Sequence, residues 1–451
     1  MLYNTAGFYH AGNDQKSELL RSVTAFDGEW KKRAPTIEGA YSFFWRLIVN
    51  IDQQVDLFMQ GTEYGDETTK NAMAVELRER LLLAQKEGRS LRVYCGYDPT
   101  STDLHLGHTI TMRKLRQFQE FGHEVTFLIG SYTALVGDPS DKNKARPVLS
   151  QEQVAENART YADQAFRILD PEKTLIRYNG EWLSGLSLLD LIRLGQNFTV
   201  QQFLARENFA ARLEKGEPIF LHETFYALMQ GYDAVAMHTD VQVGGSDQLF
   251  NIIVAGRKLQ EALGQKPLVG IITGILPGTD GIQRMSKSVG NVIPINSGPV
   301  DMFGKLMSVP DDALGKYMRL VTRWLPSKIE EIENELEAGS LHPRDAKMLV
   351  AEEIVGIFYG EEQASRARQT FVRTFQQREV PDEIPEYLMK PGQTVLEILL
   401  DAGMASSRSE ARRLFDQKGV RLDGAAIERG DQKVSPPGIL QVGKRKFLRL
   451  M

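Results

Sequence analysis

The sequence predicts an α/β fold built on a parallel sheet, with a helical segment and a small α+β unit after it. Residues 91–97 and 125–129 are short apolar runs typical of buried strands, and residues 106–121 between them carry apolar side chains at helical spacing. Strand, helix and strand in such close succession form a βαβ unit, which requires parallel strands and a right-handed crossover. After residue 299 the pattern is mostly helical, including a long stretch over residues 345–375.

Length and composition limit the class of protein. A chain of 451 residues is expected to hold about three domains. The formal charge of −5 is close to neutral for this length, so any nucleic-acid binding must come from local basic patches. The single cysteine, Cys95, excludes an intramolecular disulfide and fits a reducing compartment. With neither a signal peptide nor a membrane-spanning apolar run, we expect a cytoplasmic protein that binds no membrane and no DNA.

Changes in composition divide the chain into segments. The prolines and glycine of residues 379–393 predict a linker. Residues 1–49 carry no recognisable motif and are set apart as an N-terminal extension. Two interpretations of it stay open: translation in the natural protein begins at Val49, or the extension is genuine; the intact mass of native protein would distinguish them. The expected domains are residues 50–298, 299–378 and 394–451.

Polar residues follow the predicted strands at the edge of the sheet where ligands of such folds bind. His105 and His108, three residues apart at a helix start, should project from one face. Gly107 between them would let a ligand lie against the backbone, and a helix N-terminus suits a phosphate. A metal pair and ordinary surface histidines remain alternatives for this motif alone.

Other strand ends and one helix carry further candidates. Lys142 and Arg146 lie in a loop after the second strand, where anion binding competes with simple solvation. A helix over residues 221–237 places Tyr226, Gln230 and Asp233 on one face.

Two separated motifs together give a specific signal. HLGH at residues 105–108 and RMSKS at residues 284–288 resemble the His-Ile-Gly-His and Lys-Met-Ser-Lys-Ser signatures of class I aminoacyl-tRNA synthetases. The segments YCGYDPT, GDPS, YALMQGYDA and QVGGSDQ extend the resemblance to the bacterial tyrosyl-tRNA synthetases, from about residue 50 onward. The resemblance implies a Rossmann-like nucleotide-binding sheet, an α-helical domain and a small α+β RNA-binding domain. It also implies activation of L-tyrosine with ATP and Mg²⁺, without a protein-ligated metal, and transfer to tRNA(Tyr).

The resemblance also implies residue roles. Tyr94 and Asp233 would face the substrate's phenol hydroxyl, which both donates and accepts a hydrogen bond; the family is itself the standard example of rejecting phenylalanine in this way. The remaining tyrosine-binding candidates are Asp98, Thr133, Asp138, Tyr226, Gln230 and Gln248, with Gln242 close by. The ATP-binding candidates are Cys95, Gly96, His105, Gly107, His108, Gly245, Asp247, Met285, Ser286, Lys287 and Ser288. The catalytic candidates are His105, His108, Lys142, Arg146, Arg284 and Lys287. Arg284 departs from the family's lysine, so a planar fork replaces a point charge there.

Residues 394–451 read as helix, turn, helix and strand, and resemble the small RNA-binding domain named after a ribosomal small-subunit protein. A basic amphipathic surface helix is the alternative. The candidates for tRNA binding are Arg408, Arg412, Arg413, Lys418 and Arg421. The family is a two-fold dimer, so a homodimer is expected. Tryptophanyl-tRNA synthetase and an HxGH-type nucleotidyltransferase remain rival functions.

Overall fold

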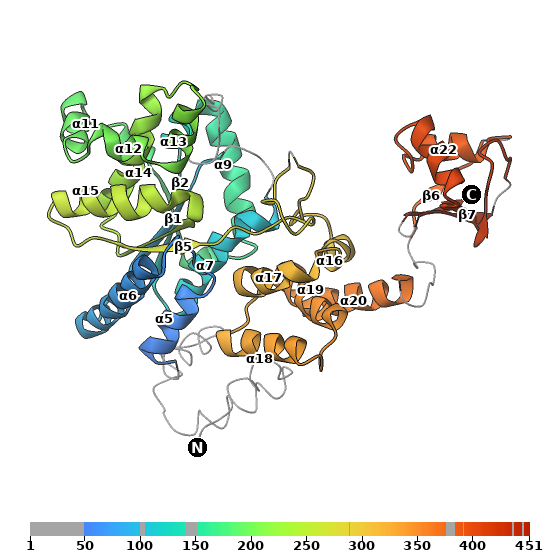
Figure 1. The fold of residues 1–451 in the computed structure, drawn as a ribbon, viewed down its shortest axis with the longest axis horizontal. Coiled ribbons are helices and arrows are strands. Elements are labelled where there is room, and N and C mark those ends of the chain that lie inside the picture. Colours follow the sequence, from blue (N-terminus) through green and yellow to red (C-terminus); the bar gives the residue numbers. More distant parts are fainter. Residues whose placement is uncertain are drawn as a thin grey trace, which may run out of the picture. The chain divides into compact units, whose positions relative to one another are not determined.

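The structure is a computed structural model that describes residues 49–99, 104–139, 151–287, 289–375, 384–390, 392–434, 437–443 and 446–451. Lys142, Arg146, Ser288 and residues 1–48 lie outside this described part. The chain divides into two compact units between Glu361 and Glu362, and each is considered by itself (Figure 1). No helix of the described residues is both long and apolar enough to cross a membrane.

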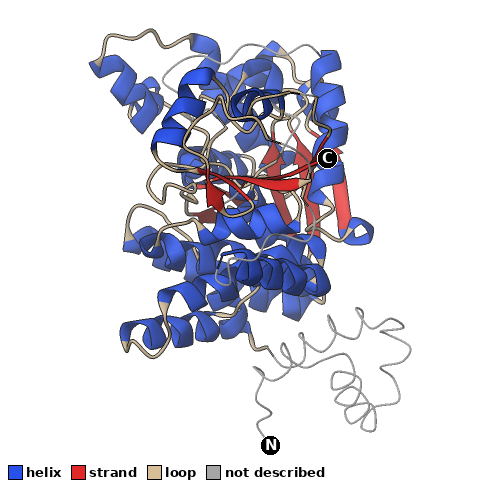
Figure 2. Ribbon diagram, turned by 90° about the vertical axis from the view of Figure 1, so that its right-hand side faces the viewer, coloured by secondary structure: helices blue, strands red, loops and turns tan. Residues whose placement is uncertain are grey.

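The first unit contains a five-stranded parallel sheet, surrounded by helices (Figure 2). This confirms the Rossmann-like prediction. The strand order is β3-β2-β1-β4-β5. The strands are β1 (Arg92–Tyr97), β2 (Glu124–Ile129), β3 (Thr174–Tyr178), β4 (Val241–Gly245) and β5 (Val269–Thr273).

The central strand β1 lies where the chain direction across the sheet reverses. Tyr94 of β1 pairs with Thr126 of β2 on one side and with Gln242 of β4 on the other. The connection that leaves β1 and the connection that reaches β4 therefore lie on opposite sides of this point. A crevice opens between them at the carboxyl ends of the two strands. The candidate residues of β1 and β4 border this crevice.

The crossover helices follow the predicted pattern closely. The segment after β1 begins with a 3-10 turn, Leu106–His108, and continues as α7 (Thr109–Glu120). The helix carrying three candidates is α14 (Leu221–Ala236), one residue shorter than predicted. The last strand, β5, ends at Thr273, because the next amide, that of Gly274, donates to the carbonyl of Gly61 outside the sheet.

Short helices complete the first unit. The predicted helical run of residues 345–375 is interrupted at Gly360, whose φ of +84° is incompatible with a continuing helix and separates α19 from α20. The helices before the first strand are α5 (Ile51–Met59) and α6 (Glu67–Glu87). The remaining helices between the first and last strands are α8 (Thr133–Val136), α9 (Gln151–Ala165), α10 (Gly180–Leu183), α11 (Leu188–Gly195), α12 (Val200–Leu204), α13 (Glu207–Glu214) and α15 (Arg257–Ala262). Those after the last strand are α16 (Pro299–Met307), α17 (Leu314–Val321), α18 (Pro326–Glu337) and α19 (Pro343–Tyr359), whereas α20 (Glu361–Phe375) begins at the boundary and belongs almost entirely to the second unit.

The second unit has its own mixed sheet and apolar core. The predicted helix, turn, helix and strand are present as α21 (Val395–Asp401), α22 (Arg408–Asp416) and β7 (Val420–Leu422). The strand order is β6-β10-β9-β7-β8, where β6 is parallel to β10 and the other pairs are antiparallel. The edge strand β6 falls inside the segment predicted as a linker. The remaining strands are β6 (Glu386–Tyr387), β8 (Ala425–Ala426), β9 (Gly438–Val442) and β10 (Lys446–Leu450).

Candidate active site

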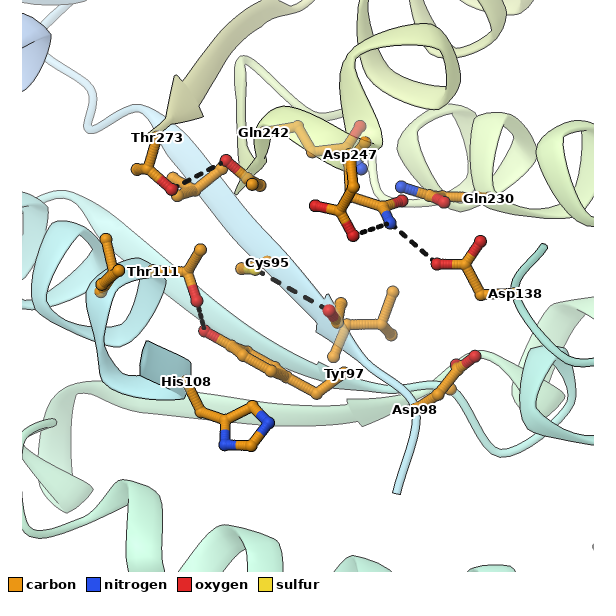
Figure 3. A pocket seen from close by; sticks show the side chains of 18 of the residues that line it. Cys95, Tyr97, Asp98, His108, Thr111, Asp138, Gln230, Gln242, Asp247 and Thr273 are labelled. Atoms are coloured by element: carbon orange, nitrogen blue, oxygen red, sulfur yellow. Dashed lines mark hydrogen bonds between the residues drawn. The ribbon is translucent and has the colours of Figure 1, made fainter. Parts of the chain in front are cut away.

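A cavity of about 250 Å³ lies at the carboxyl ends of the strands of the first unit (Figure 3). Its walls come from β1, α7, the segment after β2, α14, β4 and the loop after β5. Residues distant in sequence thus meet where the strand order predicts a ligand. The candidates that line it are Tyr94, Cys95, Gly96, Asp98, His105, Gly107, His108, Thr133, Asp138, Tyr226, Gln230, Asp233, Gln242, Gly245, Asp247, Gln248, Arg284 and Met285. Ser286 and Lys287 do not line it.

The carboxylate of Asp98 organises the region just beyond β1. Its Oδ1 accepts a hydrogen bond from Thr133 Oγ1 at 2.7 Å, and its Oδ2 accepts one from the Tyr226 hydroxyl at 2.9 Å. A Cβ atom on Gly130 would lie 1.9 Å from Asp98 Oδ1, so only glycine allows this arrangement. Because Tyr226 gives its proton to Asp98, its oxygen faces the pocket with acceptor lone pairs.

Tyr94 and Asp233 form a buried polar end of the cavity. The Tyr94 side chain is 1% exposed, and its hydroxyl has no hydrogen-bond partner among the described residues. Asp233 accepts hydrogen bonds from Trp182 Nε1 at 2.8 Å and from Asn179 Nδ2 at 3.3 Å. Burial raises the pKa of the Asp233 carboxyl to about 8, although the two donors act in the opposite direction. An unsatisfied buried hydroxyl costs roughly 1–3 kcal/mol, which a polar ligand group can relieve.

Amide and carboxylate groups form the wall opposite, where Figure 3 shows Asp138, Gln230 and Asp247 close together. Gln248 Nε2 donates to Asp138 Oδ2 at 2.8 Å and to Asp247 Oδ2 at 3.2 Å. The Gln242 side chain is 1% exposed, and its Oε1 has no partner among the described residues. This wall therefore offers both acceptors and donors to a zwitterionic ligand.

The two histidines lie together, with ring centroids 3.8 Å apart. The backbone N–H of His105 donates to His108 Nδ1 at 3.2 Å, which leaves the proton of neutral His108 on Nε2. Burial, followed by the charges of His108, Lys287 and Arg284, lowers the pKa of His105 to about 3; burial, Arg284 and Lys287 lower the pKa of His108 to about 4. Both imidazoles are therefore uncharged at neutral pH. His105 is only 7% exposed, so the surface-histidine alternative is wrong.

Gly107 lines the cavity and also has a local packing role. A Cβ atom at Gly107 would lie 3.1 Å from the His105 ring and 3.5 Å from Met285 Cβ. The glycine makes room for the imidazole and for the loop that carries Met285.

The RMSKS loop is held by its own hydrogen bonds. Asn291 Nδ2 donates to Asp280 Oδ2 at 2.6 Å, and Asn291 Oδ1 accepts from the Ser286 amide at 2.8 Å. The Met285 amide donates to the carbonyl of Leu276, near the end of β5. These contacts place Arg284 at the cavity.

Sequence reasoning missed several residues of the site. Asn179 lines the cavity and donates to both Asp233 and Thr133, while Trp182 supports Asp233 from α10. Asn179 directly follows strand β3, so the rule that ligands bind at strand carboxyl ends could have found it. Tyr97 and Thr111 also line the cavity and share a 2.9 Å hydrogen bond. Burial raises the pKa of the Cys95 thiol to about 12, so Cys95 is no nucleophile.

Several known proteins are similar to this chain over most of its length. The model of the family described as "tRNA synthetases class I (W and Y)" matches residues 85–376. The tyrosine–tRNA ligase of Thermotoga maritima is 47% identical over 383 residues, which is 84% of this chain and 95% of the relative. Tyrosine–tRNA ligase 2 of Vibrio parahaemolyticus is 48% identical over 375 residues, which is 82% of this chain and 94% of the relative.

Solved structures show the same fold at lower identity. A C-terminally truncated mitochondrial tyrosyl-tRNA synthetase of Aspergillus nidulans has a TM-score of 0.56 at 21% identity, and the match covers 75% of this chain and 97% of that one. The tyrosyl-tRNA synthetase of Archaeoglobus fulgidus, solved with L-tyrosine, has a TM-score of 0.54 at 23% identity, covering 71% and 100%. Identity of 47% across most of both chains and the family match together show that this chain belongs to the tyrosine–tRNA ligases, ATP-using ligases of class I that join tyrosine to its tRNA.

Proposed function

We propose that the cavity binds the phenol of L-tyrosine between Tyr94 and Asp233. The observation that carries this proposal is the buried, unpartnered Tyr94 hydroxyl beside a buried carboxyl group. The substrate's O–H donates to Asp233, and its oxygen accepts from Tyr94. Phenylalanine would leave both protein groups unpaired, at a cost of about 1–3 kcal/mol for each.

The other end of the amino acid meets acceptors and one amide donor. Asp138, Tyr226 and Gln230 hold the α-ammonium, with Asp98 acting on Tyr226 and Thr133. Gln248 lies near the α-carboxylate. The proposal is supported by the hydrogen bond from Tyr226 to Asp98, because it turns acceptor lone pairs of the tyrosine oxygen toward a cation.

The first reaction step requires no general base, because the tyrosine carboxylate is already ionised. It attacks the α-phosphate of ATP in line; a new P–O bond forms, and the bond to the leaving pyrophosphate breaks. His105 and His108 act as uncharged donors to phosphate oxygens, which stabilises charge that grows in the transition state. Arg284 and Lys287 neutralise the pyrophosphate. The remaining assignments are Lys142 and Arg146 to the pyrophosphate, and Cys95, Gly96, Gly107, Gly245, Asp247, Met285, Ser286 and Ser288 to ATP.

Mg²⁺ enters with ATP and neutralises phosphate charge. The described residues contain no group of three His, Cys, Asp or Glu side chains arranged to hold a metal ion. Mg²⁺ commonly keeps several water ligands, so an ion that enters with ATP would be held mainly by phosphate and water oxygens.

The second unit is proposed to bind tRNA(Tyr). Helix α22 buries Ala411 and Phe415, while its arginines are exposed to solvent. Phosphate contacts from such side chains dominate non-specific RNA affinity and weaken with salt. The exposed cations are Arg408, Arg412, Arg413, Lys418 and Arg421.

Removing residues 384–451 tests this assignment and takes β6 away with its sheet. Aminoacylation of tRNA should fall by on the order of a hundredfold or more, whereas ATP–pyrophosphate exchange should stay within about twofold, since the cavity lies in the first unit. Both assays are run on the same preparation. Equal loss of both activities would mean that the tail supports the catalytic unit, and loss of neither would mean that tRNA binds elsewhere.

A homodimer is proposed from the exposed apolar side chains of the chain segment that connects β3 to β4. Leu188 is 75% exposed and Leu221 is 73% exposed. Exposed apolar side chains in such number mark interaction surfaces. The molar mass measured in solution should equal that of two chains, and Leu188→Asp should lower it toward the mass of one chain. The exposed apolar residues of this segment are Leu188, Leu189, Ile192, Val200, Leu213, Phe220 and Leu221.

The decisive assay for the substrate is ATP–pyrophosphate exchange with each amino acid offered separately. Tyrosine should support exchange far better than tryptophan or phenylalanine. If tryptophan supported exchange best, the tryptophanyl enzyme would be favoured. If none of the amino acids supported exchange, an HxGH-type nucleotidyltransferase would be favoured.

A further inference from the structure

We propose that Asn251 is a positioning residue that fixes the amide orientation of Gln230 and Gln248 at the amino-acid side of the cavity. This inference rests on the proposed tyrosine site. Asn251 lies in a π-helical turn, Phe250–Gly256, directly after the GGSDQ segment. Its side chain is 0% exposed and is not among the residues that line the cavity. It therefore acts on the substrate only through its neighbours.

One buried amide joins two walls of the cavity. Asn251 Nδ2 donates to Gln230 Oε1 at 2.9 Å and to Gln248 Oε1 at 2.9 Å. Gln230 belongs to α14 and Gln248 to the turn after β4, and both line the cavity. Both hydrogens of the Asn251 amide nitrogen are used in this bridge.

The direction of these hydrogen bonds follows from charge. Gln248 Nε2 lies within hydrogen-bond distance of the carboxylates of Asp138 and Asp247, a place where only a donor is stable. The oxygen of the Gln248 amide must then face Asn251, so Asn251 must donate to it from its side-chain nitrogen. Because the same nitrogen also faces Gln230, the Gln230 atom that contacts it must be the oxygen. The orientation set by two carboxylates is thereby relayed to a residue on another helix.

Close packing brings the two walls within reach of a single short side chain. Gly231, next to Gln230, faces the π-helical turn, where an added Cβ would lie 3.1 Å from the Ala255 carbonyl carbon. A π-helical turn contains one residue more per turn than an α-helix, and such turns often occur at functional sites. Without Asn251, the Gln230 amide is free to rotate and exchange donor for acceptor where the substrate ammonium binds.

The test compares Asn251→Ala and Asn251→Asp in ATP–pyrophosphate exchange. Asn251→Ala should raise the KM for tyrosine by about tenfold, the equivalent of one or two neutral hydrogen bonds. The kcat at saturating tyrosine and the KM for ATP should stay within about twofold. Asn251→Asp should raise the tyrosine KM further, because a carboxylate would face two carbonyl oxygens. If that variant does not fold, Asn251→Ala alone decides.

Gln260→Ala is the matched control. Gln260 is a 1% exposed amide in α15 that does not line the cavity: its Nε2 donates to the Thr239 carbonyl at 2.9 Å, and its Oε1 accepts from the Leu268 amide at 2.7 Å. Its loss should lower the Tm and leave the tyrosine KM unchanged.

A second measurement distinguishes an effect of Asn251 that acts through Gln230 from a general destabilisation of the protein. In a Gln230→Ala background, Asn251→Ala should change the tyrosine KM by less than it does alone, because the two act through one contact. An Asn251→Ala protein with lowered Tm and unchanged tyrosine KM, or full additivity with Gln230→Ala, would overturn the proposal. Failure of the unaltered protein to exchange with tyrosine would instead refute the proposed function.

Discussion

The two ends of the cavity are built in opposite ways. The end proposed to bind tyrosine, called the tyrosine end, holds carboxyl groups, with Asp233 supported by Trp182 and Asn179, and Asp98 by Thr133 and Tyr226. The end proposed to bind the ATP phosphates, called the phosphate end, holds two uncharged imidazoles near Arg284 and Lys287. Burial raises the pKa of an acid at the first end and lowers the pKa of the bases at the second, because it disfavours charge in both cases.

Because of this difference, we expect changes at one end to alter mainly tyrosine binding and changes at the other end to alter mainly the rate of adenylate formation. Groups at the tyrosine end are already fixed by neighbours, so they should discriminate between amino acids in the ground state and in the transition state alike. The imidazoles lie where charge changes during reaction, so their contribution should appear mainly in kcat.

The largest expected effect is at the phosphate end. His108→Ala should lower the kcat of adenylate formation by about a hundredfold to a thousandfold, the usual loss for one donor to developing charge. The tyrosine KM should change by less than about threefold. Single-turnover adenylation at saturating substrates measures the first quantity, and tyrosine titration the second.

His123→Ala is the control for that experiment. His123 is a half-buried histidine that packs near Phe58 and Phe118 and does not line the cavity. Its removal should leave both constants nearly unchanged. A collapse of tyrosine binding in His108→Ala with an intact rate at saturation would reverse the assignment of the two ends.

The next effect is at the tyrosine end. Asp233→Ala should reduce the preference for tyrosine over phenylalanine in kcat/KM by about a hundredfold, because a hydrogen bond to a charged acceptor is lost for tyrosine only. The KM for ATP should stay close to its original value. An unchanged preference would show that Asp233 does not contact the phenol.

A smaller effect should appear when pH is varied. With its pKa raised to about 8, Asp233 is mostly protonated in the empty cavity at pH 6 to 7. Donation from the phenol requires the ionised form, so binding releases a proton and tyrosine affinity should rise with pH. The rise between pH 6 and 8 is at most about tenfold per pH unit. Asp233→Asn cannot titrate and should abolish this slope; the same slope in both proteins would contradict the assignment.

The smallest effect concerns stability in acid. The folded pKa values of His105 and His108 are about 3 and 4, well below the unfolded value of about 6.5. Between about pH 4 and 6.5 the unfolded chain binds more protons, so stability falls as pH falls through this window. His108→Gln should lessen the slope by up to about 1.4 kcal/mol per pH unit, as measured by urea unfolding at several pH values. Identical slopes would mean that His108 is not buried in its neutral form.

Features that depend on local sequence pattern could be predicted without the structure. Apolar runs located the strands to within a few residues, because a strand buried on both faces needs continuous apolar side chains. Helical periodicity placed Tyr226, Gln230 and Asp233 on one face, and all three line the cavity. HLGH and RMSKS identified the family because each motif is a continuous segment.

The distant residues that complete the site could be found only from the folded chain. Trp182 and Asn179 reach Asp233 from other elements, and Asn251 reaches Gln230 in the same way; no local spacing within the chain encodes those contacts. The strand β6 also depends on pairing with a distant segment, β10. The protonation states are decided at this level too, since a pKa depends on burial and on charges that folding brings near. An isolated His105 or Asp233 would titrate normally, whereas burial in the folded protein removes much of the water that would stabilise the charged form.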